Sequence, residues 1–389
     1  MVHQVRRFAI VCPNFYPRVC GIGDHSARLG AELQRRGHAV VVFSRTPVER
    51  HPEAPEVEVH GISGAIPTMI AAGIAARVAA WRPTDVIVQY TGQIWGAWRF
   101  GSPAPALVAV RARDAGAKVT LIAHELFVPW SRRPDLLVSA LMQRMYFAWL
   151  LRSSDHVFVT TETRVRYVEP YCRALGIAAP GVLRVAANAL PIARAERVEA
   201  LARNPAAPRL GLFSTAALGK RFDVVLDAFA RVASELPAAE LVLIGDLGPP
   251  DRRGVKEIKD ALRRHPAAGR IRVTGKLPLS RIAAEVAALD VYLFPMNTGA
   301  NTRSGTLPVA LGSGLPVVAT LGRETDVDLF RDGENIVFAR GLDGAAFADA
   351  TLRLLRDPAL FARVAAGASR LHADHLSWPS IVDRLLGAI

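Results

Sequence analysis

The sequence is poor in cysteine and has no long apolar run. Its 389 residues include only Cys12, Cys20 and Cys172, which are odd in number, widely spaced and in no metal-ligand pattern. A disulfide framework is therefore not expected, and the thiols fit a reducing compartment. Apolar residues make up 51% of the chain, yet no run of them approaches the roughly 20 residues that span a bilayer. Because the opening residues lack the features of a signal peptide, we expect a soluble, cytoplasmic protein.

Acidic residues are also scarce relative to basic ones, which gives a formal net charge of +13. Residues 1–190 carry 22 lysines and arginines against 13 acidic residues, and residues 191–389 carry 26 against 22. This excess favours anionic partners such as phosphates or an acidic membrane surface, although a bias toward arginine and alanine would produce it too. No nucleic-acid-binding module and no basic stripe with interleaved aromatic residues is found, so nucleic acid is not an expected partner.

Apolar, β-rich runs alternate with helical patterns along the chain, which is typical of parallel sheets covered by helices on both faces. Because the chain exceeds the size of one hydrophobic core, we expect an α/β protein with two doubly wound, Rossmann-like domains. The expected strands are Phe8–Val11, Ala39–Phe43, Val86–Gln89, Lys118–Ile122, His156–Thr160, Leu210–Ser214, Glu240–Ile244, Ile271–Thr274, Val291–Phe294, Pro316–Thr320 and Ile336–Phe338.

The composition changes sharply in one place. Residues 191–209 are charged, rich in alanine and proline, and poor in strand formers, as expected of an interdomain linker. We therefore predict an N-terminal domain over residues 1–190, a C-terminal domain over residues 210–370 and a final helical segment over residues 371–389.

Glycines follow the first expected strand. Ligands of open parallel sheets bind beyond the carboxyl ends of the strands. Here Gly21 and Gly23 come before a helix expected over Ser26–Arg36, where backbone N–H groups can approach an anion closely. A dinucleotide-binding fingerprint would need a third glycine at the position of Ser26. The loop therefore favours an anion over a nicotinamide cofactor.

Two charged or titratable side chains stand at the ends of other expected strands. Lys220 comes just before a helix expected over Asp223–Glu235, where its ammonium group adds to the helix dipole and suits a phosphate. His124 ends an apolar strand and has Glu125 beside it, a position that favours a functional role. A solvated lysine and a core histidine are the alternatives.

A third loop, over residues 297–306, contains no apolar residue larger than alanine. It ends in Ser304, Gly305 and Thr306 at an expected helix start, where a serine or threonine cap and free amides can hold a diphosphate oxygen. Arg303 can add a charge-assisted hydrogen bond to the same group. The alternative is a structural cap with a solvated arginine.

Three further features allow more than one interpretation. Asp326 and Asp328 form a D-x-D pattern, which we interpret as a helix-start feature because no acidic cluster is near. Trp95 and Trp98 can stack on an acceptor sugar or pack in the core. The apolar run over residues 136–155 fits either a buried core helix or a face that contacts an anionic membrane.

Several segments match one known family in order. They are YPRVCGIGDHSARLGAELQRRGHAVVVFS, AHELF, VAANALPI with Asn188, GKRFDVVLDAF, LVLIGDLGP, IRVTGKLP, LDVYLFP, LGSGLPVVAT and DLFRDGENIVF. The chain thereby resembles, over nearly its whole length, the retaining glycosyltransferases of family 4. The resemblance implies the GT-B fold, in which two domains face each other across a cleft and a terminal helix, here HLSWPSIVDRLL, crosses back to the first domain.

The resemblance also implies roles for individual residues. Lys220 and Gly23 would contact the diphosphate of a nucleotide-sugar donor, and His124 would face the donor sugar. The amides at residues 304–306 would hold the distal phosphate, and the loop at Gly275 would lie near the nucleobase.

The chain departs from the family's pattern at three positions. The paired glutamates of the family, eight residues apart, fall on Asn301 and Val309, and the arginine usual five residues before the lysine is Thr215. Asn301 can still hydrogen-bond a sugar hydroxyl, whereas Val309 cannot bond the ribose. Arg303 is the candidate that replaces the missing positive charge.

The expected function is transfer of a sugar, with retention and without a metal ion or cofactor, from a nucleotide-diphosphate sugar to a hydroxyl of a saccharide, lipid-linked or small-molecule acceptor. His124, Lys220 and Asn301 are the candidate catalytic residues. Trp95 and Glu125 are the candidate acceptor-binding residues, and peripheral contact with an anionic membrane is an additional expectation. A non-catalytic nucleotide-sugar-binding protein and a nucleotide-sugar epimerase remain alternatives.

Overall fold

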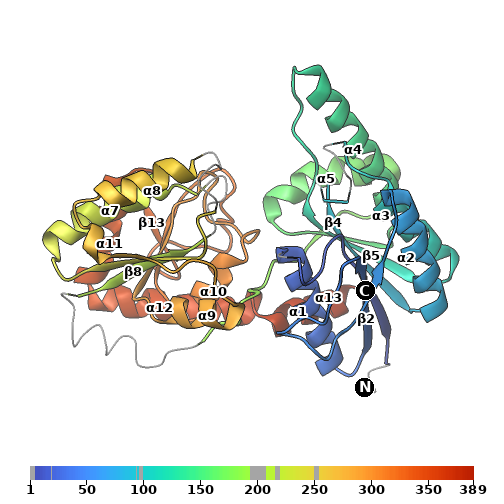
Figure 1. Ribbon diagram of the computed structural model, residues 1–389, viewed down its shortest axis with the longest axis horizontal. Coiled ribbons are helices and arrows are strands. Elements are labelled where there is room, and N and C mark those ends of the chain that lie inside the picture. Colours follow the sequence, from blue (N-terminus) through green and yellow to red (C-terminus); the bar gives the residue numbers. More distant parts are fainter. Residues whose placement is uncertain are drawn as a thin grey trace. The chain divides into compact units, whose positions relative to one another are not determined.

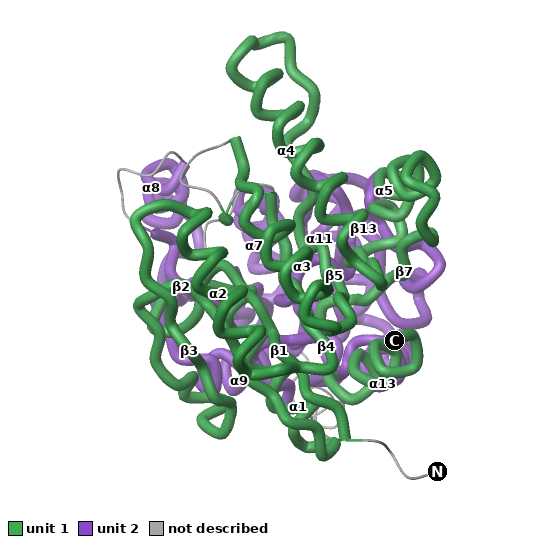
Figure 2. Tube along the Cα trace, turned by 90° about the vertical axis from the view of Figure 1, so that its right-hand side faces the viewer, with its two compact units in different colours: residues 1–185, 378–389 green, residues 186–377 purple. Residues whose placement is uncertain are grey.

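The structure is a computed structural model, and it describes residues 5–18, 20–92, 94–95, 100–192, 207–214, 220–248 and 254–389. The chain divides into two compact units (Figures 1 and 2). Unit 1 comprises residues 1–185 and 378–389, and unit 2 comprises residues 186–377.

Unit 1 is built on a seven-stranded parallel sheet with the strand order β3-β2-β1-β4-β5-β6-β7. Its strands are β1 (Arg7–Val11), β2 (Ala39–Arg45), β3 (Glu58–Ile62), β4 (Asp85–Thr91), β5 (Lys118–Glu125), β6 (His156–Val159) and β7 (Gly181–Val182). Its helices are α1 (Gly21–Arg35), α2 (Pro67–Trp81), α3 (Ala104–Asp114), α4 (Pro134–Arg152), α5 (Glu162–Leu175) and α13 (Trp378–Ala388).

The last helix, α13, belongs to unit 1 although it follows the whole of unit 2 in the sequence. It packs beside α1, where Arg36 forms an ion pair with Asp383 and donates to the backbone oxygen of Pro379 at 2.9 Å. On another side, Arg384 donates to the backbone oxygen of Val182 at 2.6 Å. These bonds fix the end of the chain within unit 1.

Unit 2 is built on a six-stranded parallel sheet with the order β10-β9-β8-β11-β12-β13. Its strands are β8 (Arg209–Phe213), β9 (Glu240–Ile244), β10 (Ile271–Val273), β11 (Val291–Phe294), β12 (Val317–Thr320) and β13 (Val337–Ala339). Its helices are α7 (Phe222–Glu235), α8 (Val255–Arg264), the 3₁₀ turn η1 (Ala268–Arg270), α9 (Leu279–Ala287), α10 (Thr306–Gly312), α11 (Gly344–Arg356) and α12 (Pro358–His375).

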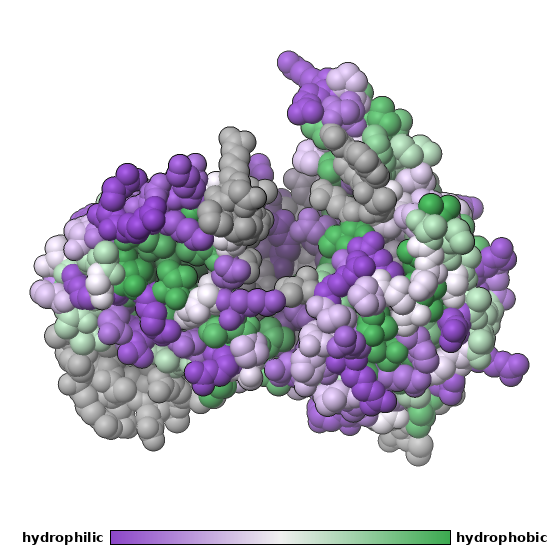
Figure 3. Space-filling view, viewed as in Figure 1, coloured by the Kyte–Doolittle hydropathy of each residue, from purple (hydrophilic) through white to green (hydrophobic). Residues whose placement is uncertain are grey.

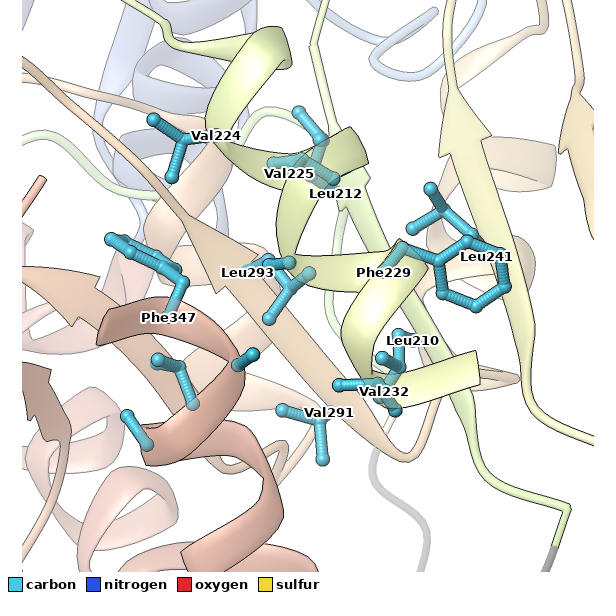
Figure 4. Close-up of a cluster of buried hydrophobic side chains, with 14 of the residues drawn as sticks. Leu210, Leu212, Val224, Val225, Phe229, Val232, Leu241, Val291, Leu293 and Phe347 are labelled. Atoms are coloured by element: carbon cyan, nitrogen blue, oxygen red, sulfur yellow. The ribbon is translucent and has the colours of Figure 1, made fainter. Parts of the chain in front are cut away.

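The core of unit 2 lies on both faces of its sheet, because successive strand residues point to opposite faces. On one face Leu210, Val291 and Leu293 pack with Phe229 of α7 and Phe347 of α11 (Figure 4). The other face is covered by α9, α10 and part of α12. Because Phe229 is fully buried, truncating it to alanine should cost about 3–5 kcal/mol of stability.

The predicted fold class, two Rossmann-like parallel α/β sheets, is confirmed. Sequence reasoning missed β3 and β7, which are a half-exposed edge strand and a two-residue strand. The final helix begins at Trp378 rather than near residue 371, because α12 continues to His375 and ends at Leu376. Most of the expected linker, residues 193–206, lies outside the described residues.

Both sheets reverse their strand order at one point, between β1 and β4 in unit 1 and between β8 and β11 in unit 2. Open α/β sheets bind ligands beyond the carboxyl ends of the strands at such switch points. A ligand of either unit is therefore expected at these points.

Candidate active site

Lys220 lies at the switch point of unit 2. Its backbone pairs with Met296, and the next residue, Arg221, donates its N–H to the oxygen of Pro295 at 3.0 Å. The Lys220 ammonium donates to the backbone oxygen of Phe213, at the end of β8, at 3.0 Å, and to Thr306 Oγ1 at 3.3 Å. The lysine thus joins the end of one strand to the beginning of α10.

The charge of Lys220 is opposed by its surroundings. Burial lowers the pKa of this lysine from 10.5 to about 7, because the charged form loses solvation that nothing fully replaces. A lysine poised near neutral pH becomes fully charged when an anion approaches, so its position suits a phosphate ligand.

Thr306 and Ser304 continue the polar contacts from Lys220, with their hydroxyl oxygens 2.9 Å apart. The expectation that a serine or threonine caps this helix is wrong. Gly305 is the N-cap residue of α10, no side chain caps this helix, and Thr306 is its first residue. The two hydroxyl groups instead bond to each other and, through Thr306, to Lys220.

Asn301 is 3% exposed and is held within its own loop. Its side-chain oxygen accepts the N–H of Arg303 at 3.2 Å, and its amide nitrogen donates to the oxygen of Gly299 at 3.3 Å. Asn301 therefore shapes the backbone that carries Arg303. Within the described residues, the guanidinium group of the half-buried Arg303 forms no hydrogen bond or ion pair.

The expectation that Asp326 begins a helix is wrong as well. This buried carboxylate accepts from the backbone N–H of Thr302 at 2.8 Å and from the Thr302 hydroxyl at 2.9 Å. It therefore secures the loop that ends in Arg303. In the part of the chain that the structure describes, no group of three or more His, Cys, Asp or Glu residues is placed to hold a metal ion.

Glycine is required where this loop approaches its neighbour. A Cβ atom on Gly299, whose φ is +95°, would lie 2.1 Å from Thr325 Oγ1 and 2.6 Å from the nitrogen of Gly322. Only glycine combines this backbone conformation with so close an approach. The small residues over 297–306 are thus partly explained by packing.

The structure also places two other residues of unit 2 that the family resemblance singled out. Val309, a residue of α10, is fully buried in the core of unit 2. Gly275 follows β10, its φ is +70°, and the space around its Cα is open. Thr215 lies outside the described residues.

In unit 1, His124 lies at the end of β5 and is 8% exposed. Its Nε2 is 2.5 Å from Gln89 Oε1 at the end of β4. Since an amide oxygen can only accept, Nε2 carries the proton and Nδ1 is an acceptor. Burial, followed by the nearby His25 and Arg164, lowers the pKa of His124 well below 6.5. The imidazole is therefore neutral at physiological pH.

His25 and Gln89 complete this cluster and were missed by sequence reasoning. The His25 ring lies edge-on to the His124 ring with centroids 4.9 Å apart, and it also contacts Trp378 of α13. Among the described residues, neither His25 Nδ1 nor Gln89 Nε2 has a hydrogen-bond partner, although both are buried. Such orphan groups call for a ligand or water. The available signal was a glutamine near the end of an otherwise apolar strand at the switch point.

Arg164 of α5 holds the end of β5. It donates to the backbone oxygen of His124 and, at 2.9 Å, to Thr160 Oγ1. Its guanidinium also lies 3.7 Å from the exposed carboxylate of Glu125. Glu125 therefore stands at the surface next to the His124 cluster.

The expectation that Gly21 and Gly23 precede the first helix is wrong. They form its first turn, because α1 begins at Gly21. A Cβ on Gly23 would lie 2.9 Å from the oxygen of Asn14, so this glycine lets the helix pack against the preceding loop. Trp95 is 6% exposed and donates its indole N–H to the oxygen of Gln89 at 2.9 Å. The interpretation of Trp95 as a stacking surface for a sugar is wrong, and Trp98 lies outside the described residues.

Comparison with known proteins gives a family match within unit 2. Residues 207–357 match the family model described as glycosyl transferases group 1. A phosphatidyl-myo-inositol mannosyltransferase from Mycobacterium leprae is 31% identical over 172 residues, which are 43% of this chain and 42% of that protein. A D-inositol 3-phosphate glycosyltransferase from Thermomonospora curvata is 31% identical over 168 residues, 42% of this chain and 38% of that protein. The chain spans about two fifths of the length of these curated relatives.

Solved structures match almost the whole chain at low identity. Sucrose-phosphate synthase from Thermosynechococcus elongatus aligns with a TM-score of 0.70 and 16% identity over 98% of both chains. Anabaena Alr3699/HepE in complex with UDP-glucose aligns with a TM-score of 0.68 and 15% identity over 99% of this chain and 100% of that one. A protein assigned as a UDP-N-acetylglucosamine 2-epimerase from Listeria monocytogenes aligns with a TM-score of 0.64 and 15% identity over 99% of this chain and 96% of that one.

These likenesses define the chain first as a two-domain protein with the GT-B fold. Within that fold, residues 207–357 are similar to the glycosyl transferases of group 1, and the two curated relatives are a mannosyltransferase and a glycosyltransferase.

Proposed function

We propose that the protein transfers a sugar from a nucleotide-diphosphate sugar to a hydroxyl group of an acceptor. The observation that supports this most is the position of Lys220, whose ammonium group is held between the end of β8 and the beginning of α10 at a switch point. The family match covers this same region.

On the donor side, the departing diphosphate needs positive charge and oriented donors while the anomeric carbon becomes cationic. Lys220 supplies one charge. The guanidinium of Arg303, which has no partner among the residues that the structure describes, is the candidate for a second. The hydroxyl groups of Ser304 and Thr306 can donate to a phosphate oxygen once a ligand replaces their mutual bond. The glycine at 275 leaves room for a base near β10.

On the sugar side, we assign the neutral His124 to the donor sugar, as the resemblance to family 4 implies. A neutral imidazole whose Nδ1 is an acceptor suits a sugar hydroxyl and does not suit a general acid. Retention of configuration would follow if the departing phosphate helps to deprotonate the incoming hydroxyl on the same face. Glu125, exposed beside this cluster, remains the candidate contact for the acceptor.

Two alternatives rest on particular observations. The fold is shared with a protein assigned as a UDP-N-acetylglucosamine 2-epimerase, so epimerisation of the donor is a second candidate. A binding protein without catalysis is a third candidate, because Asn301 stands where the family has a glutamate and is bonded within its own loop. Product analysis separates the three, since only a transferase needs an acceptor to consume the donor.

The test begins with a thermal-shift screen of nucleoside diphosphates and their sugars, because a ligand that binds only the folded state raises the melting temperature. The best ligand is then titrated into Lys220→Met and Arg303→Ala. We expect Lys220→Met to abolish saturable binding and Arg303→Ala to weaken it about tenfold, the worth of one charged hydrogen bond. The control is Lys256→Met, which removes an exposed lysine from α8 of the same unit.

Two results would reject the proposal. One is the lack of saturable binding by any sugar nucleotide to the unaltered protein. The other is binding that Lys220→Met leaves unchanged. If Arg303→Ala alone has no effect, only the role of Arg303 as a replacement charge is rejected.

A further inference from the structure

Helix α4 of unit 1 is apolar on both its inner and its outer face. Its inner face packs Ala140, Phe147, Leu150 and Leu151 into unit 1. The outer face exposes a stripe of large apolar side chains, which we call the α4 stripe: Leu137 (45% exposed), Val138 (48%), Leu141 (52%), Met145 (57%) and Trp149 (40%). Positions 137, 141, 145 and 149 recur every four residues, so they lie along one line of the helix. Soluble monomers rarely leave such a contiguous apolar surface uncovered.

The α4 stripe is carried on the part of unit 1 that projects farthest. Two perpendicular views show the beginning of α4 and the segment before it extending beyond the other elements of unit 1 (Figures 1 and 2). The space-filling view shows hydrophobic atoms along this projection below a hydrophilic tip (Figure 3). The surface is therefore convex, and a groove is not what it offers to a ligand.

A tryptophan extends the apolar surface ahead of the helix and is held in place. Trp130 is 59% exposed, and its ring lies 4.0 Å from the guanidinium carbon of Arg144. The same guanidinium stacks on Phe127 at 4.1 Å and donates to the backbone oxygens of Val128 and Ala140 at 2.9 Å. This buried arginine fixes the loop before α4 so that Trp130 points outward. Tryptophan at the edge of an apolar face is favoured where the face meets lipid headgroups.

The charges beside the α4 stripe are mostly positive. Arg132 and Arg133 are exposed at the beginning of α4, and Arg152 is exposed at its end. Asp135, in the first turn, is the one acidic residue between positions 126 and 154, and its carboxylate lies 3.2 Å from Arg133. An apolar face flanked by arginines complements an anionic lipid surface.

The same charges disfavour a second copy of the chain as the occupant. If two α4 stripes packed antiparallel about a two-fold axis, Arg132 and Arg133 of one copy would approach Arg152 of the other. Like charges brought together at an interface oppose association. A parallel arrangement would bring each arginine against its own counterpart.

We propose that the α4 stripe, with Trp130 and the arginines at its ends, docks the protein onto the surface of a membrane that contains anionic lipid. The helix lies in the plane of the headgroups, with Leu141 and Met145 entering the apolar layer. Within the described residues no helix is both long and apolar enough to cross a bilayer. This inference concerns a surface outside the donor site and does not depend on catalysis.

The test is co-sedimentation of the full-length chain with vesicles of phosphatidylcholine alone and of phosphatidylcholine with about one third phosphatidylglycerol. We expect binding to the anionic vesicles, weakened by salt. The double variant Leu141→Gln, Met145→Gln should bind about tenfold or more weakly, because two half-exposed apolar side chains no longer enter the lipid. Arg132→Ser with Arg133→Ser should weaken binding roughly 25-fold, at about fivefold for each charge near the surface.

The matched control is Met69→Gln. Met69 of α2 is 56% exposed, against 57% for Met145, and lies on the same unit. Its replacement should leave vesicle binding unchanged. Circular dichroism melting confirms that each variant is folded, and the donor-binding assay should give the same affinity for all of them.

The proposal is overturned if the unaltered protein does not bind anionic vesicles, or if the glutamine pair on α4 binds as well as the Met69 control. It is also overturned if light scattering shows a dimer that the glutamine pair converts to a monomer, because the α4 stripe would then be an interface between copies. Failure of the donor-binding assay would not affect it, so the two proposals fail separately.

Discussion

The affinity for a nucleotide-diphosphate sugar should fall as the pH rises from 7 to 9, because the proposed binding site uses the protonated form of Lys220. In the free protein, burial lowers the pKa of this lysine to about 7. A diphosphate within hydrogen-bond reach favours the charged form and should return the pKa toward the ordinary value. Above neutral pH, binding must therefore be accompanied by uptake of a proton.

The magnitude follows from the two protonation states. With a pKa of about 7, roughly half of the free protein carries a charged Lys220 at pH 7 and about one hundredth does so at pH 9. If the pKa in the complex lies above 9, affinity should weaken about 50-fold over this range, or about 2.3 kcal/mol. Stability should change in the opposite direction. Because the folded-state pKa of Lys220 is below its unfolded value, the unfolded state binds more protons above pH 7, and the free energy of unfolding rises with pH there.

Isothermal titration of the sugar nucleotide at pH 7, 8 and 9, in buffers that differ in ionisation enthalpy, gives both the affinity and the number of protons taken up. Lys220→Arg keeps its charge throughout this range, so its affinity should be nearly independent of pH. Lys256→Met should retain the pH dependence of the unaltered protein. The reasoning is refuted if no proton is taken up at pH 8, or if Lys220→Arg loses as much affinity between pH 7 and 9 as the unaltered protein does.

Four further outcomes are expected. Val309→Glu should lower the free energy of unfolding by several kcal/mol, because it places an unpaired carboxyl group in the core of unit 2; denaturant titration measures this, with Val309→Ile as the control. Gly299→Ala should cost at least about 1–3 kcal/mol, because its Cβ would collide with Thr325, and an unaltered melting temperature would contradict the packing argument. Burial lowers the pKa of His25 from 6.5 to about 4, so the free energy of unfolding should decrease as the pH falls from 6.5 to 4. In unfolding curves measured over this range, His25→Phe should make that decrease smaller by up to about 3 kcal/mol. Transfer should continue in excess chelator if Lys220 and Arg303 suffice to stabilise the diphosphate, and its loss with recovery on added divalent cation would show that they do not.

The fold was predictable because local patterns and global topology agree. Buried strands such as Glu240–Ile244 and Val291–Phe294 are apolar runs bounded by helix signals, and their predicted limits are those of β9 and β11. Edge strands offer a weaker signal. In β3 only Ile62 is buried, so its sequence lacks the apolar run of a central strand, and its place is set by pairing with β2.

The candidate site was predictable to a smaller extent. Lys220 was found because a lysine between a strand and a helix has a direct electrostatic interpretation. The contacts that govern its pKa come from Phe213 and Thr306, which are distant in sequence and can be identified only after folding. Likewise, the burial of Trp95 depends on a bond to the backbone of Gln89, and no periodicity in the sequence shows it.

The lowered pKa of Lys220 is consistent with the uncharged residues at positions 301 and 309. Desolvation alone accounts for the lowered pKa of the lysine, whereas a carboxylate nearby would oppose that shift and keep the lysine charged. The buried acidic group of the neighbouring loop, Asp326, already accepts two bonds from Thr302, and Asn301 and Val309 add no charge. Within the described residues the lysine thus has no acidic partner, and its protonation is determined by whatever anion binds. A site of this kind would have weak affinity for a neutral ligand. It would select a diphosphate, because the bound anion raises the pKa of Lys220 and the lysine then takes up a proton from solvent.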